Sequence, residues 1–311
     1  TNSNSLIGTG TMTVAGNFTN NAVLTQSALN ISSGAVFTNN NEITLNNLTI
    51  NANGTLLSNS LSNLNILNSI VNNGRLEIDG GTLDCSIRGS GAIVKNGTAT
   101  LILSTASYFT GSIEINNGKL ITTVANTPGK IYGSAGVNSE TMEFSDNNTS
   151  VTLNEIDTTQ YLTNFEKTGN SKINIANNFK AKTAKITDGI LSVNNLDTTK
   201  IFEIDSITFS NSAKLSGNAN ITGNVIMKNN SRLAPGNSIG ETNITGDLNF
   251  NDSSIYEVEI IQTNLKNTSG LSDQIIASGN ITISTTASMN LVNTEGSKYF
   301  IPETFNILTG N

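Results

Sequence analysis

Three pairs of acidic residues are the side chains in this sequence whose types and spacing could do chemistry. Each pair is spaced i, i+2, which puts both carboxylates on one face of a β-strand. Carboxylate pairs with a nearby Arg or Lys can act as general acid and base in polysaccharide cleavage. Apolar neighbours occupy the other strand face, so these acids point to solvent, and no tryptophan is available to stack on a sugar. We interpret them as solvated outer-face acids: Glu77 with Asp79, Glu203 with Asp205, and Glu257 with Glu259.

The composition excludes several kinds of catalytic site. Histidine is absent, which removes Ser-His-Asp and Cys-His nucleophile systems, histidine general bases and histidine metal sites. The single cysteine, Cys85, cannot form an intrachain disulfide, and its sequence context favours a buried strand position over a reactive thiol. Gly80-Gly81 followed by Asp84 occurs once, without the tandem Asp register of calcium-binding nonapeptide repeats. The sequence therefore predicts no enzyme, no cofactor and no metal site.

The chain is weakly charged and rich in small polar residues. It has 23 acidic and 16 basic residues, a net charge of −7 and a sequence pI of about 4.7. Nucleic-acid binding would need a clustered excess of Lys and Arg, so these values argue against a nucleic-acid partner. About one residue in six is asparagine, a composition that could also produce disorder. Ile, Leu and Val nevertheless recur regularly between the polar residues, which favours a folded chain.

A short phrase recurs along the chain. It consists of an apolar residue, two or three small polar residues, usually a glycine, one more residue, and a second apolar residue. Successive copies begin 19, 21, 44, 71, 23 and 18 residues apart, mostly near one or two units of about twenty residues. The copies are Ile31–Val36, Ile50–Leu56, Val71–Leu76, Ile115–Leu120, Ile186–Leu191, Phe209–Leu215 and Met227–Leu233.

Short strands, Asn/Gly turns and a period near twenty predict an all-β solenoid of parallel strands, with one turn of the coil per repeat. A leucine-rich repeat is an alternative, because Leu45-Asn-Asn-Leu48 looks similar, but that phrase is not sustained at a fixed period. An antiparallel sandwich or barrel is a second alternative, and it does not explain the recurring turn phrase. We expect any side excursion between Thr122 and Asp146, where Pro128, Gly129, Gly133 and Gly136 cluster.

One turn near the C-terminus differs from the recurring phrase. Pro235 fixes φ, Gly236 permits a positive φ and Asn237 tolerates one, which predicts a sharp, specified turn. Alternating apolar and polar residues follow it, as expected of half-buried strands. The predicted structural motif before a C-terminal cap consists of Leu233, Pro235, Gly236, Asn237, Ser238, Ile239 and Gly240.

Two stretches resemble parts of the passenger domains of classical bacterial autotransporters. Gly91–Leu103, continuing through Tyr108-Phe-Thr-Gly111 to Ile115–Leu120, is similar to the passenger-associated strand repeat: it has a Lys-x-Gly phrase, an alternating Leu strand and a closing Asn-Gly-x-Leu. Here Phe109 and Thr110 separate Tyr108 from Gly111. The second stretch resembles the segment just before the membrane-anchored part; it comprises Leu233–Gly240, Gly246–Phe250 and Ser254–Ile260, and Ser272–Gly279 and Tyr299–Leu308 also fit.

The resemblance implies a right-handed parallel β-helix that is exported by type V secretion. Residues 1–232 would form the passenger rungs, and residues 233–311 a C-terminal capping, autochaperone-like region of the same solenoid with a β-hairpin-type end. The Asn- and Ile-rich, Cys-poor composition suits an AT-rich genome, and rickettsial surface cell antigens or fusobacterial adhesins are the similar families it suggests. The expected location is the surface of a Gram-negative bacterium, or its surroundings, after export through the periplasm and outer membrane.

The function that the resemblance implies is that of an adhesin or its structural stalk, which binds a host-cell or bacterial surface protein or glycan. The alternative is a secreted toxin or effector passenger that acts on host cells. The Gly-Asp-Ser-Gly motif of passenger serine proteases is absent. A second implied partner is the passenger's own outer-membrane translocator barrel. No alternating membrane-barrel segments follow Asn311, so we expect that barrel to lie outside this chain.

Overall fold

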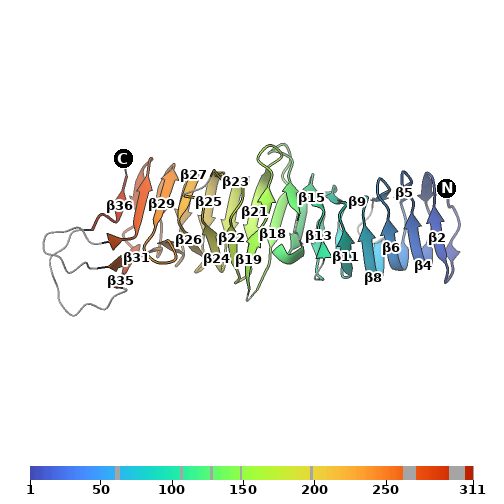
Figure 1. The fold of residues 1–311 in the computed structure, drawn as a ribbon, viewed down its shortest axis with the longest axis horizontal. Helices are drawn as coiled ribbons and strands as arrows, with labels where there is room; N and C mark the ends of the chain where they lie inside the picture. The colour runs from blue at the N-terminus through green and yellow to red at the C-terminus, as the bar shows by residue number, and fades with distance from the viewer. Residues whose placement is uncertain are drawn as a thin grey trace. The chain divides into compact units, whose positions relative to one another are not determined.

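The computed structural model describes residues 1–59, 64–105, 108–126, 129–147, 149–196, 199–261, 271–293 and 305–310. The described residues form β-strands, one 3-10 turn (η1, Val124–Asn126) and no α-helix. They divide into two compact units, Thr1–Ser145 with Asn154–Asn164, and Asp146–Leu153 with Phe165–Asn311. Each unit is a parallel β-solenoid with rungs of ~20 residues, as the stacked arrows of Figure 1 show.

The first unit has three ladders of strands. One contains β1 (Leu6–Ile7), β2 (Thr11–Val14), β4 (Leu24–Ile31), β6 (Ile43–Ile50), β8 (Leu64–Asn72), β11 (Ser86–Gly89) and β14 (Tyr108–Phe109). The second contains β3 (Phe18–Asn20), β5 (Val36–Asn39), β7 (Thr55–Ser58), β9 (Arg75–Ile78), β12 (Ala92–Lys95), β15 (Ser112–Ile115), β17 (Lys130–Tyr132) and β20 (Glu155–Ile156). The third contains β10 (Gly81–Leu83), β13 (Thr100–Leu103), β16 (Lys119–Thr122) and β18 (Thr141–Phe144).

The second unit has two ladders and also includes the second half of β21 (Leu162–Lys167), from Phe165 on. One ladder contains β19 (Ser150–Leu153), β22 (Lys172–Ile175), β24 (Ile190–Val193), β26 (Lys214–Gly217), β28 (Arg232–Pro235), β31 (Ile255–Ile261), β32 (Leu271–Ser272) and β35 (Ser288–Asn293). The other contains β23 (Phe179–Ile186), β25 (Phe202–Phe209), β27 (Ala219–Met227), β29 (Glu241–Thr245), β30 (Leu248–Phe250), β33 (Gln274–Ala277), β34 (Ile281–Ile283) and β36 (Leu308–Thr309).

The alternation of apolar and polar residues explains why each strand buries one face. In the short strands β5, β7 and β9, every second residue is buried. Parallel register places Phe37 beside Leu56 and Leu56 beside Leu76, so the apolar residues form columns through consecutive rungs. A similar column in the second unit stacks Phe179 on Phe202, with ring centroids 4.6 Å apart. Each rung thus completes its core only against its neighbours.

The recurring phrase of the sequence forms corners of the solenoid, between different pairs of ladders. Each copy begins at or beside the last residue of one strand and reaches the next strand, as in β4 to β5 and β15 to β16. The corner residue adopts a positive φ at Gly34, Asn53, Gly118, Gly189, Asn211 and Asn229. Gly and Asn tolerate this conformation better than other residues, which is why they fill the phrase. The predicted parallel solenoid is confirmed.

Parallel pairing excludes the antiparallel sandwich as the fold of the described residues. The described strands pair in parallel except β31 with β32, which pair antiparallel through Ile260–Ser272 and Ile261–Leu271. That antiparallel pair is the hairpin-type feature at the C-terminal end. The strands after Leu233 otherwise extend the same ladders, since β31 pairs in parallel with both β28 and β35. The leucine-rich-repeat alternative fails because that repeat needs a helix or a 3-10 turn in each unit, and the described residues contain η1 alone.

A side excursion is present in the predicted interval. The loop Gly133–Ser139 leaves the solenoid between β17 and β18, and the turn Asp157–Tyr161 accompanies it. Figure 1 shows green loops that extend beyond the strand ends near β18 and β21. Of the residues whose clustering predicted the excursion, Pro128 lies outside the described residues.

Candidate functional site

The first acidic pair is held by basic and amide groups. Glu77 on β9 accepts hydrogen bonds from Arg75 Nε (2.5 Å) and Asn96 Nδ2 (2.9 Å). The Arg75 guanidinium also reaches Glu114 on β15 (3.2 Å). These contacts link β9 to the next two rungs and occupy both oxygens of the Glu77 carboxylate. Asp79, the other member of the pair, is half-buried.

The other two acidic pairs also contain one ion-paired member. Glu203 bonds Lys180 (2.8 Å), while Asp205 is exposed. Glu257 bonds Lys214 (2.7 Å) and Arg232 (3.3 Å). Burial tends to raise the pKa of Glu257, but the hydrogen bond and charge of Lys214, with Arg232, lower it overall.

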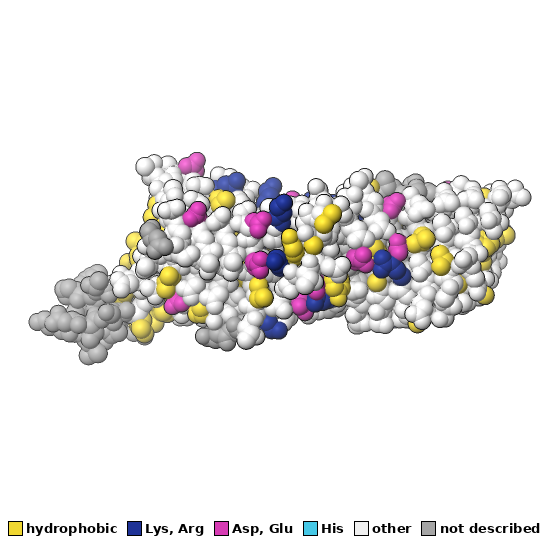
Figure 2. Space-filling view, turned by 90° about the horizontal axis from the view of Figure 1, so that it is seen from above, with side chains coloured by type: hydrophobic (Ala, Val, Ile, Leu, Met, Phe, Trp, Pro, Cys, Tyr) yellow, Lys and Arg dark blue, Asp and Glu magenta, His cyan; other side chains and the backbone are white. Residues whose placement is uncertain are grey.

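Basic and acidic side chains lie beside one another on the face shown in Figure 2, within a mostly uncharged surface. The carboxylates of Glu77, Glu203 and Glu257 are therefore held in ion pairs along the rungs. This arrangement refines the interpretation of these residues as solvated acids, because Glu77, Glu203 and Glu257 are partly covered and paired.

The motif Leu233–Gly240 forms a tight corner after β28. Leu233, Pro235 and Gly236 are buried, Asn237 and Ser238 are exposed, and Ile239 and Gly240 are half-buried. The backbone N–H of Gly236 donates to Gly217 O (3.0 Å), and the N–H of Gly217 donates to Gly236 O (3.1 Å). Gly236 has φ +76°, and a Cβ there would lie 2.2 Å from Ser238 O. The predicted sharp turn is present, and the residue after Pro235 must be a glycine.

Asp273 fastens this corner, and the sequence reasoning assigned it no role. Its side chain is fully buried. Its Oδ1 accepts a hydrogen bond from the Gly240 N–H (2.8 Å), and its Oδ2 accepts one from the Glu259 N–H (2.7 Å). Burial raises the pKa of Asp273 to about 6, against the two backbone hydrogen bonds, which lower it. One carboxyl thus joins the motif to β31.

Two buried lysines form equivalent corners, one in each unit. Lys95 Nζ donates to the carbonyls of Gly97 and Asn117 (3.1 Å to the latter). Lys167 Nζ donates to the carbonyls of Gly169 and Asp188 (2.9 Å to the latter). Both side chains are almost fully buried, and burial lowers the pKa of each to about 8. The Lys-x-Gly phrase therefore supplies an internal cation that binds the corner carbonyls of its own and the next rung.

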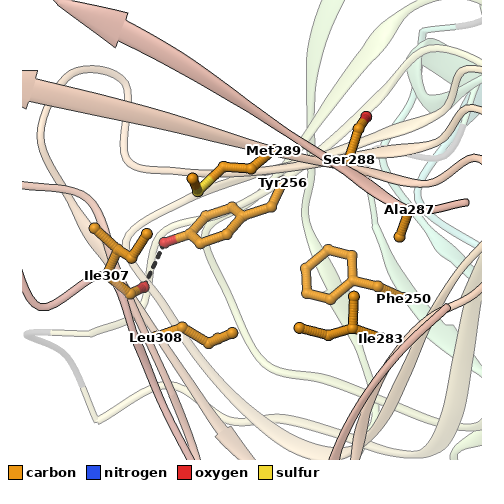
Figure 3. A pocket seen from close by; sticks show the side chains of 8 residues that line it. All are labelled: Phe250, Tyr256, Ile283, Ala287, Ser288, Met289, Ile307 and Leu308. Carbon is orange, nitrogen blue, oxygen red and sulfur yellow. Dashed lines mark hydrogen bonds between the residues drawn. The ribbon is translucent and has the colours of Figure 1, made fainter. Parts of the chain in front are cut away.

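An apolar pocket of about 240 Å³ lies near the C-terminal end of the second unit (Figure 3). Phe250 and Tyr256 stack on one side with ring centroids 5.9 Å apart, and the Tyr256 hydroxyl donates to Ile307 O (2.6 Å). Burial raises the pKa of Tyr256, so its hydroxyl stays protonated as a donor. The pocket could accept an apolar side chain. Its lining residues are Phe250, Tyr256, Ile283, Ala287, Ser288, Met289, Ile307 and Leu308.

Within the part of the chain that the structure describes, no three His, Cys, Asp or Glu residues gather in a way that could hold a metal ion. The described residues also contain no helix with the length and apolar character needed to cross a membrane. Cys85 is buried on the solenoid, as its sequence context predicts, and burial raises the pKa of its thiol to about 11. Neither a family model, nor a curated protein, nor a solved structure matches this sequence.

Proposed function

We propose that this chain is part of the passenger of a type V secreted protein and works as an adhesin or as its structural stalk. The observation that supports this most is the solenoid itself, whose parallel ladders repeat along each unit beneath a mostly uncharged polar surface. The stretches that resemble autotransporter passengers also have distinct structural roles. One contains the Lys95 corner, and the other contains the Gly236 corner fastened by Asp273.

The test is a binding titration of the purified, fluorescently labelled chain on mammalian epithelial cells, endothelial cells and Gram-negative bacteria. We expect saturable binding to at least one of these surfaces without a change in cell viability. Labelled serum albumin is the control. Binding no higher than that of albumin on every surface would contradict the adhesin function, and cell damage by the chain would support the toxin alternative.

We also propose that residues 233–311 cap the solenoid and promote its folding, in the way that the autotransporter resemblance implies. The pairings of β26 with β28 and of β27 with β29 are the contacts through which this region would cover the preceding rungs. Deletion of residues 235–311 should leave the remaining chain sensitive to protease. Unchanged protease resistance of the shortened chain would contradict the proposal.

A further inference from the structure

The sequence contains four Asn-Gly steps, in which an asparagine is followed directly by a glycine. Such a step can lose ammonia when the backbone nitrogen of the glycine attacks the side-chain carbon Cγ of the asparagine. Glycine favours this attack because it has no Cβ to restrict the approach of its backbone. The four steps are Asn53-Gly54, Asn73-Gly74, Asn96-Gly97 and Asn117-Gly118.

The Asn117-Gly118 step brings its reacting groups together. It lies in the corner between β15 and β16, where Gly118 has φ +68°. The Gly118 N–H donates to Oδ1 of the Asn117 side chain (2.8 Å), so the backbone nitrogen faces the amide that it would attack. Asn117 is half-buried, and no hydrogen bond to another described residue restrains its Nδ2, the group that would leave.

In two of the other steps the glycine N–H is directed elsewhere. The Gly54 N–H donates to the carbonyl of Asn51 (2.8 Å). The Gly74 N–H donates to Oδ1 of Asn72 and not to its own neighbour Asn73 (3.2 Å). Neither nitrogen therefore faces the side chain that it would have to attack.

In the remaining step the asparagine side chain is held away. Asn96 Nδ2 donates to Glu77 (2.9 Å), and Asn96 Oδ1 accepts from Asn116 Nδ2 (2.9 Å). Both ends of this amide are thus occupied by neighbouring rungs. The same two residue types have a geometry suited to attack at Asn117 alone among the four steps.

A buried ammonium group lies at the peptide that has to lose its proton. When the Gly118 nitrogen releases its proton, negative charge spreads onto Asn117 O, the carbonyl oxygen of the same peptide group. Lys95 Nζ donates to that oxygen (3.1 Å), and an added Cβ on Gly118 would lie 2.8 Å from Nζ. Burial lowers the pKa of Lys95 to about 8, against the charge of Asp79, so most of this lysine is charged at pH 7. A fixed positive charge where negative charge develops accelerates such a step.

The second unit contains the acidic counterpart of this corner. Lys167 Nζ donates to Asp188 O (2.9 Å), and the Gly189 N–H donates to Asp188 Oδ1 (2.7 Å). The contacts are those of the Lys95 corner, with an aspartate in place of the asparagine. The charge of Asp188 raises the pKa of Lys167, which burial lowers. The solenoid corner thus accommodates a carboxylate where Asn117 has an amide.

We propose that Asn117-Gly118 is a self-modification site, at which Lys95 promotes the loss of the Asn117 side-chain amide as ammonia. The Gly118 nitrogen gives its proton to water and forms a bond to Asn117 Cγ. The bond from Cγ to Nδ2 breaks, and Nδ2 takes up a proton from water and leaves as ammonia. Water then opens the resulting imide at one of its two carbonyl carbons, which leaves aspartate or isoaspartate at position 117. The reaction adds one carboxylate beside Lys95.

The experiment follows all four steps in the intact chain by peptide mapping and mass spectrometry during incubation at pH 7.5. Deamidation at Asn117 should be at least about tenfold faster than at the other three asparagines, because its groups are already oriented. In the urea-unfolded chain the four rates should be similar. A rate at Asn117 no higher than the others in the folded chain, or the same preference in urea, would overturn the inference. A cross-linked peptide that joins Lys95 to Asn117 would also overturn it.

Two lysine variants test the role of the buried charge. Lys95→Met should slow deamidation at Asn117 at least about tenfold, because the developing charge on Asn117 O loses its partner. Lys167→Met is the matched control: it removes the equivalent buried amine from the second unit and should leave the Asn117 rate unchanged. An unchanged or faster reaction in Lys95→Met would overturn the inference.

The pH dependence of the rate separates charge from a structural role of Lys95. Between pH 7 and 9 deamidation in Lys95→Met should rise in proportion to hydroxide. In the original chain it should rise less steeply, because Lys95 loses its proton as the pH passes 8. Equal slopes in the two proteins would contradict the assigned role of Lys95.

Discussion

The rungs before Asn59 and the rungs after Arg232 both consist of parallel strands, but they fix their corners differently. In the early rungs like side chains stack, as where Asn20 Nδ2 donates to Asn39 Oδ1 (2.9 Å) across 19 residues. In the late rungs the interval grows to 33 residues between Gly240 and Asp273, and that single carboxylate fastens the corner. A repeated contact spreads stability over many neighbours, whereas a unique contact concentrates it in one residue.

The difference shows that repetition in sequence and tolerance to substitution are separate properties. The early rungs repeat their side chains, yet the first unit also contains a column of glycines with no space for a side chain. A Cβ on each of the later members would meet the carbonyl oxygen of the glycine before it, at 2.2 Å or less. The column consists of Gly54, Gly74, Gly91, Gly111 and Gly129.

The largest effect is expected where this column is broken. Gly111→Ala would place a Cβ 1.8 Å from Gly91 O and 2.6 Å from a ring carbon of Phe109, which forces two rungs apart. We expect a loss of about 3 kcal/mol in the free energy of unfolding, measured by urea denaturation. Gly16→Ala is the control, because nothing lies within 4 Å of its added Cβ. Equal stability of the two variants would show that neighbouring rungs can separate without cost.

The second largest loss of stability is expected when Asp273, which holds the Gly240 corner of the late rungs, is replaced. Asp273→Ala would leave the N–H groups of Gly240 and Glu259 without their acceptor, at a cost of about 2 kcal/mol. Hydrogen exchange at these two amides should accelerate, while exchange at Asn39 stays unchanged. Asp247→Ala is the control, since Asp247 also accepts a backbone hydrogen bond across 33 residues, at an exposed site. A similar acceleration of hydrogen exchange throughout the chain would mean that Asp273 stabilises the whole chain and not this corner alone.

The Asp273 corner should also depend on pH. Because the pKa of Asp273 is raised from 3.8 to about 6, the folded state binds more protons than the unfolded state between these values. The stability that protonated Asp273 contributes is complete below pH 4 and is lost as the pH rises through 6. The stability difference between the original chain and Asp273→Ala should therefore be larger at pH 4 than at pH 7. A difference that grows with pH would contradict this assignment.

Both units contain a lysine corner. The effect of these lysines on the pH dependence of stability has the opposite sign to that of Asp273. Burial lowers the pKa of Lys95 and Lys167 from 10.5 to about 8. Between pH 8 and 10.5 the unfolded state binds more protons, so these lysines should make stability rise with pH, by up to about 1 kcal/mol per pH unit each. Urea denaturation at pH 7.5 and 9 should show the rise, and the Lys95→Met/Lys167→Met variant should lack it. An unchanged slope in the variant would assign the titration to other groups.

The sequence predicted the rungs better than their fastenings, for a physical reason. The corner phrase needs Gly or Asn at a positive φ, so its recurrence could be recognised from residue types alone. The Leu233–Gly240 turn was predicted in the same way from Pro235 and Gly236. Asp273, Glu140 and Lys167 bind groups that lie far away in sequence or on neighbouring rungs. The lysines do share the local phrase Lys-x-Gly, but no local pattern distinguishes the buried carboxylates of Asp273 and Glu140 from the solvated acids around them.

The smallest loss of stability is expected in the exposed one of two columns of stacked asparagine side chains in the early rungs. Asn40 Nδ2 donates to Asn21 (2.8 Å) and Asn59 Nδ2 donates to Asn40 (3.0 Å), all at exposed positions, where water can replace either bond. Asn40→Ala should therefore cost only about 0.5 kcal/mol.

The adjacent Asn39→Ala should cost about 2 kcal/mol, because it strands the fully buried amide of Asn20. Urea denaturation of the two single variants measures the difference. Equal costs would mean that burial does not set the strength of an amide column. The stability of the early corners would then depend only on how many amides are stacked. The early corners and the Asp273 corner would differ only in the number of contacts, and burial would play no part in the difference.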